Sequence, residues 1–218
     1  MRQALLWDID GTLIDTTDLI VDSLDFTYRK HIGRSLPRDE IRALIGTPLR
    51  EQICVFGDPA TLGATADEML VDFVQYYEAH RDQERLIPEA IDCLRKAHGC
   101  GRPTALITSK NHVEVANTLP RLGIEGYVDL VISVDDVVNP KPDPEGILKA
   151  LDRFGITRDQ AIFIGDTVHD MRAGAGAGVA RLAVTWGACP RPLLVAEAPE
   201  AICDDPAELV RILEVHGC

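Results

Sequence analysis

The chain has 218 residues, 46% of them hydrophobic and 26% charged, a composition typical of a globular protein that buries a substantial core. Its formal net charge is −13, which argues against electrostatic binding to nucleic acid or to an anionic membrane. No apolar stretch approaches the ~20 residues that a membrane-spanning helix requires, and the first residues do not resemble a signal peptide. We therefore expect a cytoplasmic protein with no nucleic-acid or membrane partner.

The cysteines are scattered and form no CxxC pair, and a chain of this size folds without disulfide bonds. We expect all of them to be reduced: Cys54, Cys93, Cys100, Cys189, Cys203 and Cys218. No second ligand pair follows Cys93, His98 and Cys100, so no zinc site is predicted.

The first apolar run, Ala4 to Trp7, predicts a buried strand. Roughly 90 residues of mostly helical pattern then precede the next strand, far more than the ~12 that a crossover between parallel strands needs. We expect an inserted helical domain over residues 16–86, with residues 1–15 and 87–218 forming the core.

The first helix of the insertion is expected after Asp15-Thr16-Thr17-Asp18, whose side chains suit a helix N-terminus, and Gly33 is expected to close it. Further helical pattern covers residues 38–44, 48–56 and 64–80. The chain is expected to return to the core at 86–88, where Pro88 suits the first turn of a helix over 88–98.

The second half alternates short apolar runs with amphipathic stretches of helix length, which predicts a parallel sheet covered by helices on both faces, an α/β fold. A short edge strand and a last helix are expected at the C-terminal end. The expected strands span 104–107, 130–134, 161–164, 182–184 and 201–203, and the last helix spans 206–215.

Two carboxylates, Asp8 and Asp10, directly follow the first predicted strand and are separated by one residue. Ligands of open α/β sheets bind at the carboxyl ends of the strands, and in extended chain these two side chains face the same way. Gly11 lets the backbone turn closely past a phosphate. By itself the string fits an Asp-rich turn before a helix equally well.

Polar groups at three other predicted strand ends favour chemistry over such a turn. They are Thr108-Ser109, Lys141 within Asn139 to Pro144, and the pair Asp166 and Asp170. Gly174 to Gly178 does not have the spacing of a dinucleotide-binding loop and is expected to end a helix. Phe73, Tyr76 and Tyr77 are expected to pack inside the insertion.

These four motifs, in this order and over nearly the whole chain, resemble those of haloacid dehalogenase-like phosphatases with a small helical cap. The resemblance implies a Rossmann-like α/β core, an α-helical cap domain, a bound Mg²⁺ and a small phosphorylated metabolite as partner. Carried over to this chain, it implies Asp8 as nucleophile, Asp10 as general acid and base, Gly11, Thr108, Ser109 and Lys141 as phosphate ligands, and Asp8, Asp10, Asp166 and Asp170 as the metal site.

Charge balance agrees with a metal at this site. A carboxylate that attacks a phosphate dianion meets repulsion of ~4 kcal/mol per charge pair at about 4 Å and an effective dielectric constant of about 20. Lys141 alone does not offset Asp8, Asp166 and Asp170, whereas a divalent cation brings the site close to neutrality.

Within the family, the motifs are most similar to phosphoglycolate phosphatases and pyrophosphatases. Arg50 and Thr16 are the candidate substrate-side residues of the cap, with Arg50 able to meet a second anionic group unless it is a solvated surface residue. Related dehalogenases lack a residue equivalent to Asp10, and related sugar phosphomutases carry a histidine where this chain has Ile20.

A phosphate-sensing receiver-like module is the alternative outside the enzymes, because receivers also combine an aspartyl phosphorylation site with a hydroxyl residue and a lysine. The long insertion disfavours it, since a receiver needs no cap. The oligomeric state stays open.

Overall fold

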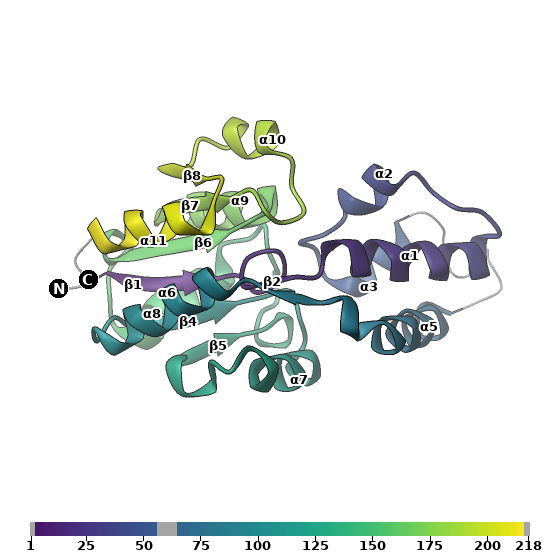
Figure 1. Ribbon diagram of the computed structural model, residues 1–218, viewed down its shortest axis with the longest axis horizontal. Coiled ribbons are helices and arrows are strands. Elements are labelled where there is room, and N and C mark those ends of the chain that lie inside the picture. The colour runs from purple at the N-terminus through teal and green to yellow at the C-terminus, as the bar shows by residue number, and fades with distance from the viewer. Residues whose placement is uncertain (1–2, 56–64, 216–218) are drawn as a thin grey trace.

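A computed structural model describes residues 3–55 and 65–215 of the chain. Its centre is a six-stranded sheet in the order β5-β4-β1-β6-β7-β8, in which every neighbouring pair is parallel (Figure 1). The strands are β1 (Ala4–Trp7), β4 (Thr104–Ile107), β5 (Leu130–Ile132), β6 (Ala161–Gly165), β7 (Ala180–Val184) and β8 (Ala201–Cys203).

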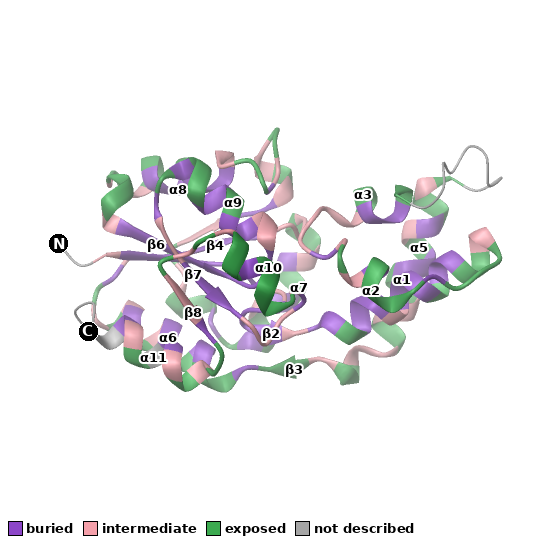
Figure 2. Cartoon of the chain, turned by 90° about the horizontal axis from the view of Figure 1, so that it is seen from above, coloured by how far each residue is buried: buried purple, intermediate pink, exposed green. Residues whose placement is uncertain are grey.

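Helices cover both faces of this sheet, as the alternating sequence pattern predicted. They are α6 (Pro88–Gly99), α7 (His112–Leu122), α8 (Glu145–Phe154), α9 (Val168–Ala177), α10 (Arg191–Ala196) and α11 (Pro206–Val215). Successive residues of a strand point to opposite faces, so Leu5 and Trp7 pack with α6 and α11, while Leu6 and Phe163 pack with α8 and α9. Both faces of the central strands are therefore buried (Figure 2).

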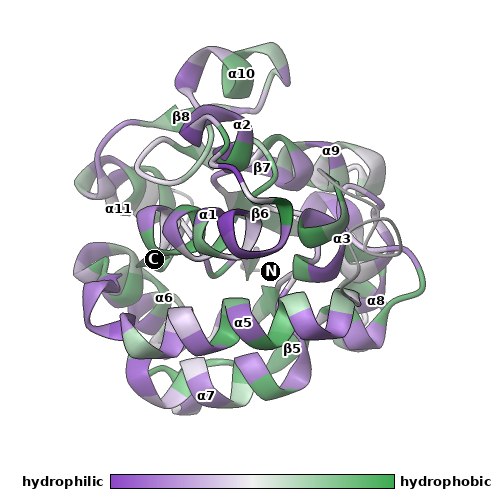
Figure 3. Cartoon of the chain, turned by 90° about the vertical axis from the view of Figure 1, so that its right-hand side faces the viewer, coloured by the Kyte–Doolittle hydropathy of each residue, from purple (hydrophilic) through white to green (hydrophobic). Residues whose placement is uncertain are grey.

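A second group of helices lies beyond the end of the sheet, on the right in Figure 1. Its members are α1 (Thr17–Ile32), α2 (Arg38–Arg42), α3 (Leu49–Cys54) and α5 (Ala66–Ala79). Here they are called the helical unit. Val21, Leu24, Met69 and Phe73 belong to a core of its own. Figure 3, which views the molecule from this end, shows purple and green mixed along α1 and α5, as amphipathic helices require.

Two strands join the helical unit to the sheet. β2 (Ile14–Asp15) and β3 (Arg85–Leu86) pair antiparallel, with Ile14 opposite Leu86. Asp15 Oδ1 accepts a hydrogen bond from the Thr17 backbone N–H at 3.2 Å, and Gly33 ends α1 in the left-handed conformation. Both ends of α1 thus lie where the sequence predicted them.

The α/β fold is confirmed. The short strands β2 and β3 were not predicted, and the predicted strands of the central sheet differ from the observed ones at their ends. β5 stops at Ile132 because Ser133 begins a short 3₁₀ turn, so the predicted strand to Val134 was too long. α9 ends at Ala177 with Gly178 left-handed, as expected of a helix end. The predicted ends at Phe56 and Ala64 lie outside the described residues.

No disulfide bond joins the described cysteines, which are Cys54, Cys93, Cys100, Cys189 and Cys203, and Cys218 lies outside the described residues. Among the described helices, none is both long and apolar enough to cross a bilayer. That residues 16–86 act as a separate cap domain stays a prediction.

Candidate active site

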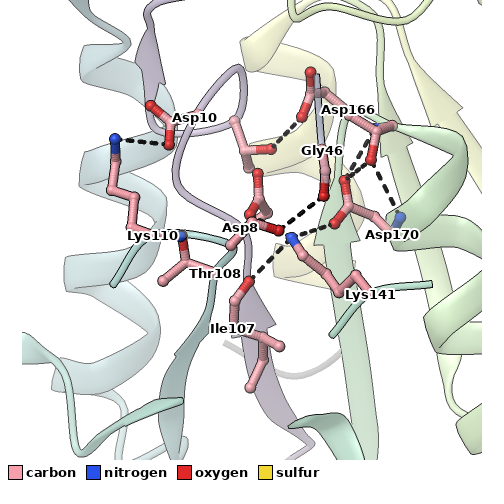
Figure 4. A network of polar contacts seen from close by, with 12 residues as sticks. Asp8, Asp10, Gly46, Ile107, Thr108, Lys110, Lys141, Asp166 and Asp170 are labelled. Atoms are coloured by element: carbon pink, nitrogen blue, oxygen red, sulfur yellow. Dashed lines mark hydrogen bonds and ion pairs between the residues drawn. The ribbon is translucent and has the colours of Figure 1, made fainter. Parts of the chain in front are cut away.

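The four predicted motifs meet at one edge of the sheet. Asp8 directly follows β1, Thr108 follows β4 and Asp166 follows β6, because parallel strands place their carboxyl ends side by side. Asp170 comes from the first turn of α9, and Lys141 comes from the loop before α8. Figure 4 shows these side chains converging.

Lys141 joins the cluster of carboxylates. Its Nζ atom lies 2.6 Å from Asp8 Oδ1 and 2.7 Å from Asp170 Oδ1, and it donates to the Ile107 carbonyl at 3.3 Å. Burial lowers the pKa of this ammonium group, but the charges of Asp170 and Asp8 outweigh burial and raise it overall. Lys141 is thus a fixed positive charge among buried carboxylates.

Asp166 is the most enclosed of these carboxylates. It is fully buried, and its side chain accepts hydrogen bonds from the Ala188 backbone N–H at 2.7 Å and from Thr12 Oγ1 at 3.4 Å. A Cβ atom added at Gly11 or Gly187 would lie far inside van der Waals contact with this carboxylate. Gly11 therefore makes room for Asp166, a role that differs from the predicted approach to phosphate.

Oxygen atoms of Asp8, Asp166 and Asp170 all lie within 4.8 Å of one another. Burial, followed by the charges of Asp170 and Asp8, raises the pKa of Asp166 well above its ordinary value. Burial also raises the pKa of Asp8 from 3.8 to about 7, against the lowering effect of Lys141. When ionised, these three carboxylates carry more negative charge than the positive charge of Lys141 offsets. Such a set of buried oxygen donors fits a hard divalent cation such as Mg²⁺.

Asp10 lies to the side of this cluster, on the strand end that leads into the Gly11 turn (Figure 4). Thr16 Oγ1 donates to Asp10 Oδ1 at 2.8 Å, and Lys110 Nζ lies 2.9 Å from Asp10 Oδ2. Burial lowers the pKa of Lys110, yet the carboxylates of Asp10 and Glu114 raise it overall. Two residues on opposite sides thus hold the Asp10 carboxylate.

Lys110 was not among the site residues predicted from the sequence. Its signal was its position two residues after Thr108 in the loop that follows β4, at the same sheet edge as the other motifs. Thr16 was expected on the substrate side, and the structure places its hydroxyl against Asp10. Arg50 pairs with Asp67 on the surface, and it is absent from the residues that line the cavity described below.

Thr108 and Ser109 form the turn after β4. Thr108 Oγ1 accepts a hydrogen bond from the Lys110 backbone N–H at 3.2 Å. Ser109 Oγ donates to the Gly46 carbonyl at 2.8 Å, which ties the loop after α2 to the sheet. Gly46 has a φ of +107°, and a Cβ atom there would crowd Thr167. The close approach of the loop after α2 to the sheet edge therefore depends on this glycine.

A cavity of about 330 Å³ opens above Asp8, between the sheet edge and the helical unit. Asp8, Asp10, Thr108 and Lys141 contribute to its floor, and residues of α1, α3 and α5 contribute to its opposite wall. Its volume falls in the range of ~300–1,000 Å³ that is common for organic ligands. Phe73 and Tyr77, which were expected only inside the insertion, also line it.

Comparisons with known proteins agree with this geometry. Residues 5–184 match the model of the family described as haloacid dehalogenase-like hydrolase. The chain is 32% identical to pyrophosphatase PpaX of Bacillus velezensis, over 97% of this chain and 96% of that protein. It is also 32% identical to the "Probable phosphatase IndB" of Dickeya dadantii, over 96% and 93% of the two chains.

A solved structure shares the fold over nearly its whole length. The haloacid dehalogenase-like hydrolase SP0104 of Streptococcus pneumoniae superposes with a TM-score of 0.79 and 27% identity, over 97% of this chain and 98% of the other.

Proposed function

The chain belongs to the haloacid dehalogenase-like hydrolase family, and from this premise we propose that it is a Mg²⁺-dependent phosphatase that hydrolyses small phosphate monoesters through an aspartyl-phosphate on Asp8. One observation carries the proposal. A buried lysine bridges Asp8 and Asp170, while Asp166 lies close enough to share a cation with both. This arrangement offers a nucleophile, a fixed positive charge and a metal site at the floor of one cavity.

Asp8, Asp166 and Asp170 are the side chains that would hold the metal, together with a backbone or carboxylate oxygen of Asp10. When bound, Mg²⁺ would offset the negative charge that repels a phosphate from Asp8. Lys141 remains as a second positive charge, and the turn at Thr108 and Ser109 lies at the same floor to receive phosphate oxygens.

Asp8 attacks the phosphorus atom through a carboxylate oxygen, and the bond between phosphorus and the leaving oxygen breaks. Asp10 gives its proton to that oxygen, so the alcohol leaves neutral. Asp10 then takes a proton from the water that attacks the aspartyl-phosphate, which returns Asp8 and releases inorganic phosphate. Thr16 and Lys110 hold Asp10 in place for both transfers.

A direct test compares two aspartate variants with 4-nitrophenyl phosphate as substrate. Asp8→Asn removes the nucleophile and is expected to lower kcat by ~10⁴-fold or more. Asp92→Asn, on the exposed side of α6, is the control and should keep full activity. Chelation of Mg²⁺ should stop the wild-type enzyme. Turnover that survives in Asp8→Asn, or that ignores the chelator, contradicts the proposal.

Turnover also separates a phosphatase from a receiver-like module. A phosphatase releases many equivalents of phosphate for each chain, whereas a receiver takes up one from a small donor and stops. Acid-quenched enzyme should carry a phosphoryl group on the peptide with Asp8, detectable by mass spectrometry. A single burst without turnover would favour the receiver.

Phosphoglycolate is one candidate substrate, favoured by the similarity of the motifs to phosphoglycolate phosphatases; the position of Arg50 against Asp67 on the surface adds no support to it. Pyrophosphate is the second candidate, favoured by the name of a relative that is 32% identical. A phosphomutase is disfavoured, because Ile20 lines the cavity and no histidine stands among the described residues that line it.

A further inference from the structure

The wall of the cavity opposite Asp8 is mainly apolar, although Gln52 of α3 and Glu78 of α5 also line the cavity. The helical unit supplies it with Ile20, Ile45, Leu49, Leu70, Phe73 and Val74. An anionic group buried against such a wall would lose its hydration without gaining a hydrogen bond. The wall instead favours the apolar face of an organic group.

Every cation that lines the cavity already has a carboxylate partner. Lys141 pairs with Asp8 and Asp170, and Lys110 pairs with Asp10. Arg81 pairs with Glu78 and has Glu84 at 3.9 Å. Residues 56–64, which the structure does not describe, contain no lysine or arginine in sequence. A second anionic group on a substrate thus has no unpaired cation among the described lining residues.

The lining away from the floor carries Glu78, Glu84 and Glu114 together with Lys110 and Arg81. Glu84 also pairs with Arg121, which does not line the cavity. The pKa of Tyr77 on the same wall is raised, first by burial and then by the charge of Asp10. An additional anion would therefore meet carboxylates there and would find no unpaired cation among the described lining residues.

We propose that the substrate is a phosphate monoester whose alcohol portion is uncharged and has an apolar face. The inference rests on the proposed phosphatase activity and deepens it. The transferred phosphate occupies the floor near Asp8, and the alcohol portion extends toward Phe73 and Val74. Asn111 and Asn117 line the same cavity and offer amide groups to a hydroxyl of the alcohol. Pyrophosphate and phosphoglycolate, which both carry a second anion, are poor substrates on this proposal.

Two esters of nearly equal shape test the charge. In 4-carboxybenzyl phosphate the alcohol portion carries an anion, and in 4-carbamoylbenzyl phosphate an amide replaces it. Full-length enzyme with Mg²⁺ is expected to hydrolyse the carbamoyl ester with a kcat/KM about tenfold higher or more. Pyrophosphate and phosphoglycolate are measured in the same assay and should fall below both.

A variant of the wall should reverse this preference. Val74 is 46% exposed and lines the cavity, whereas Val71, on the same helix, is 53% exposed and is absent from the lining. Val74→Lys adds a cation to the wall, within reach of Glu78 one turn further along α5, and is expected to shift the ratio of kcat/KM toward the carboxy ester by about tenfold. Val71→Lys is the matched control and should leave the ratio unchanged.

The outcomes separate the two proposals. If pyrophosphate or phosphoglycolate gives the highest kcat/KM, or if both lysine variants shift the ratio equally, the inference is overturned while the phosphatase proposal stands. If no ester is hydrolysed with Mg²⁺, including 4-nitrophenyl phosphate, the phosphatase proposal fails and the inference fails with it. A carbamoyl preference that only Val74→Lys reverses supports both.

Discussion

Asp8 and Asp10 are separated by one residue, yet their surroundings differ. Asp8 is 5% exposed, lies against Lys141 and shares its neighbourhood with two further buried carboxylates. The Asp10 side chain is 18% exposed, borders the cavity and is held by Thr16 from the base of α1 and by Lys110 from the loop after β4. Ile9 lies between the two, and the turn at Gly11 follows Asp10.

These different surroundings indicate different chemical roles for the two carboxylates. The surroundings of Asp8 are buried and charged, which suits a nucleophile next to a cation. The surroundings of Asp10 combine groups from the sheet edge and from the helical unit, which suits a proton donor that must meet a leaving group entering from the cavity. Changes on the Asp8 side should therefore affect all substrates, and changes on the Asp10 side should depend on the leaving group.

Lys141→Met is the change on the Asp8 side with the largest expected effect. It removes the positive charge between Asp8 and Asp170 and should lower kcat/KM by ~10³-fold, equally for good and poor leaving groups. The freed carboxylates should also bind Mg²⁺ more tightly, which isothermal titration with the metal alone can measure. Weaker metal binding together with unchanged turnover would contradict the assigned role.

Lys110→Met tests the Asp10 side. Without the ion pair at 2.9 Å, Asp10 is less well positioned, and kcat for an alkyl phosphate should fall by about tenfold to 100-fold. For 4-nitrophenyl phosphate, whose leaving group needs little protonation, the loss should be only a few-fold. Lys110→Arg keeps the charge and should restore part of the activity. An equal loss for both esters would mean that Lys110 acts on the phosphate and not on Asp10.

The sequence was sufficient to predict the members of the Asp8 side. Asp8, Thr108 and Asp166 follow predicted strands, and a parallel sheet brings such ends together whatever the details of packing. Asp170 was predicted from the resemblance to the family, and it lies in the first turn of α9, which starts two residues after Asp166. These placements depend on element order and strand direction, which hydrophobic patterns indicate well.

The Asp10 side depends on packing that the sequence does not show. Lys110 would ordinarily be a solvated lysine, and only the turn of the loop after β4 directs it to Asp10. The contact of Thr16 depends on the β2–β3 pairing, which brings the start of α1 back to the sheet. Arg50 does not line the cavity, and its guanidinium pairs with Asp67, at the start of α5, on the surface.

The pKa of Asp8 predicts a pH effect on stability in the absence of metal. The folded chain keeps this proton up to about pH 7, whereas an unfolded carboxyl group titrates near its ordinary value of 3.8. The folded state therefore binds more protons between these values, and its free energy of unfolding should decrease as pH rises from about 4 to 7. Urea unfolding with a chelator present can measure this decrease.

The pKa of Asp166 is raised as well, so Asp8→Asn should reduce the pH dependence of the free energy of unfolding without abolishing it. Saturating Mg²⁺ should oppose the decrease, because the metal binds the ionised carboxylates of the folded state alone. A stability that rises with pH over this window in the chelated protein would mean that Asp8 is ionised when folded.

The smallest expected effect comes from Thr16→Val, which keeps the shape of the side chain and removes its hydrogen bond to Asp10 Oδ1. A hydrogen bond to a charged group contributes ~1.5 kcal/mol, and Lys110 still holds the other oxygen, so kcat for an alkyl phosphate should fall by about tenfold. Thr16→Ser retains the hydroxyl and should match the wild type. If Thr16→Val instead raises KM and leaves kcat unchanged, Thr16 contacts the substrate, as the sequence suggested. Thr16 would then have no part in positioning Asp10.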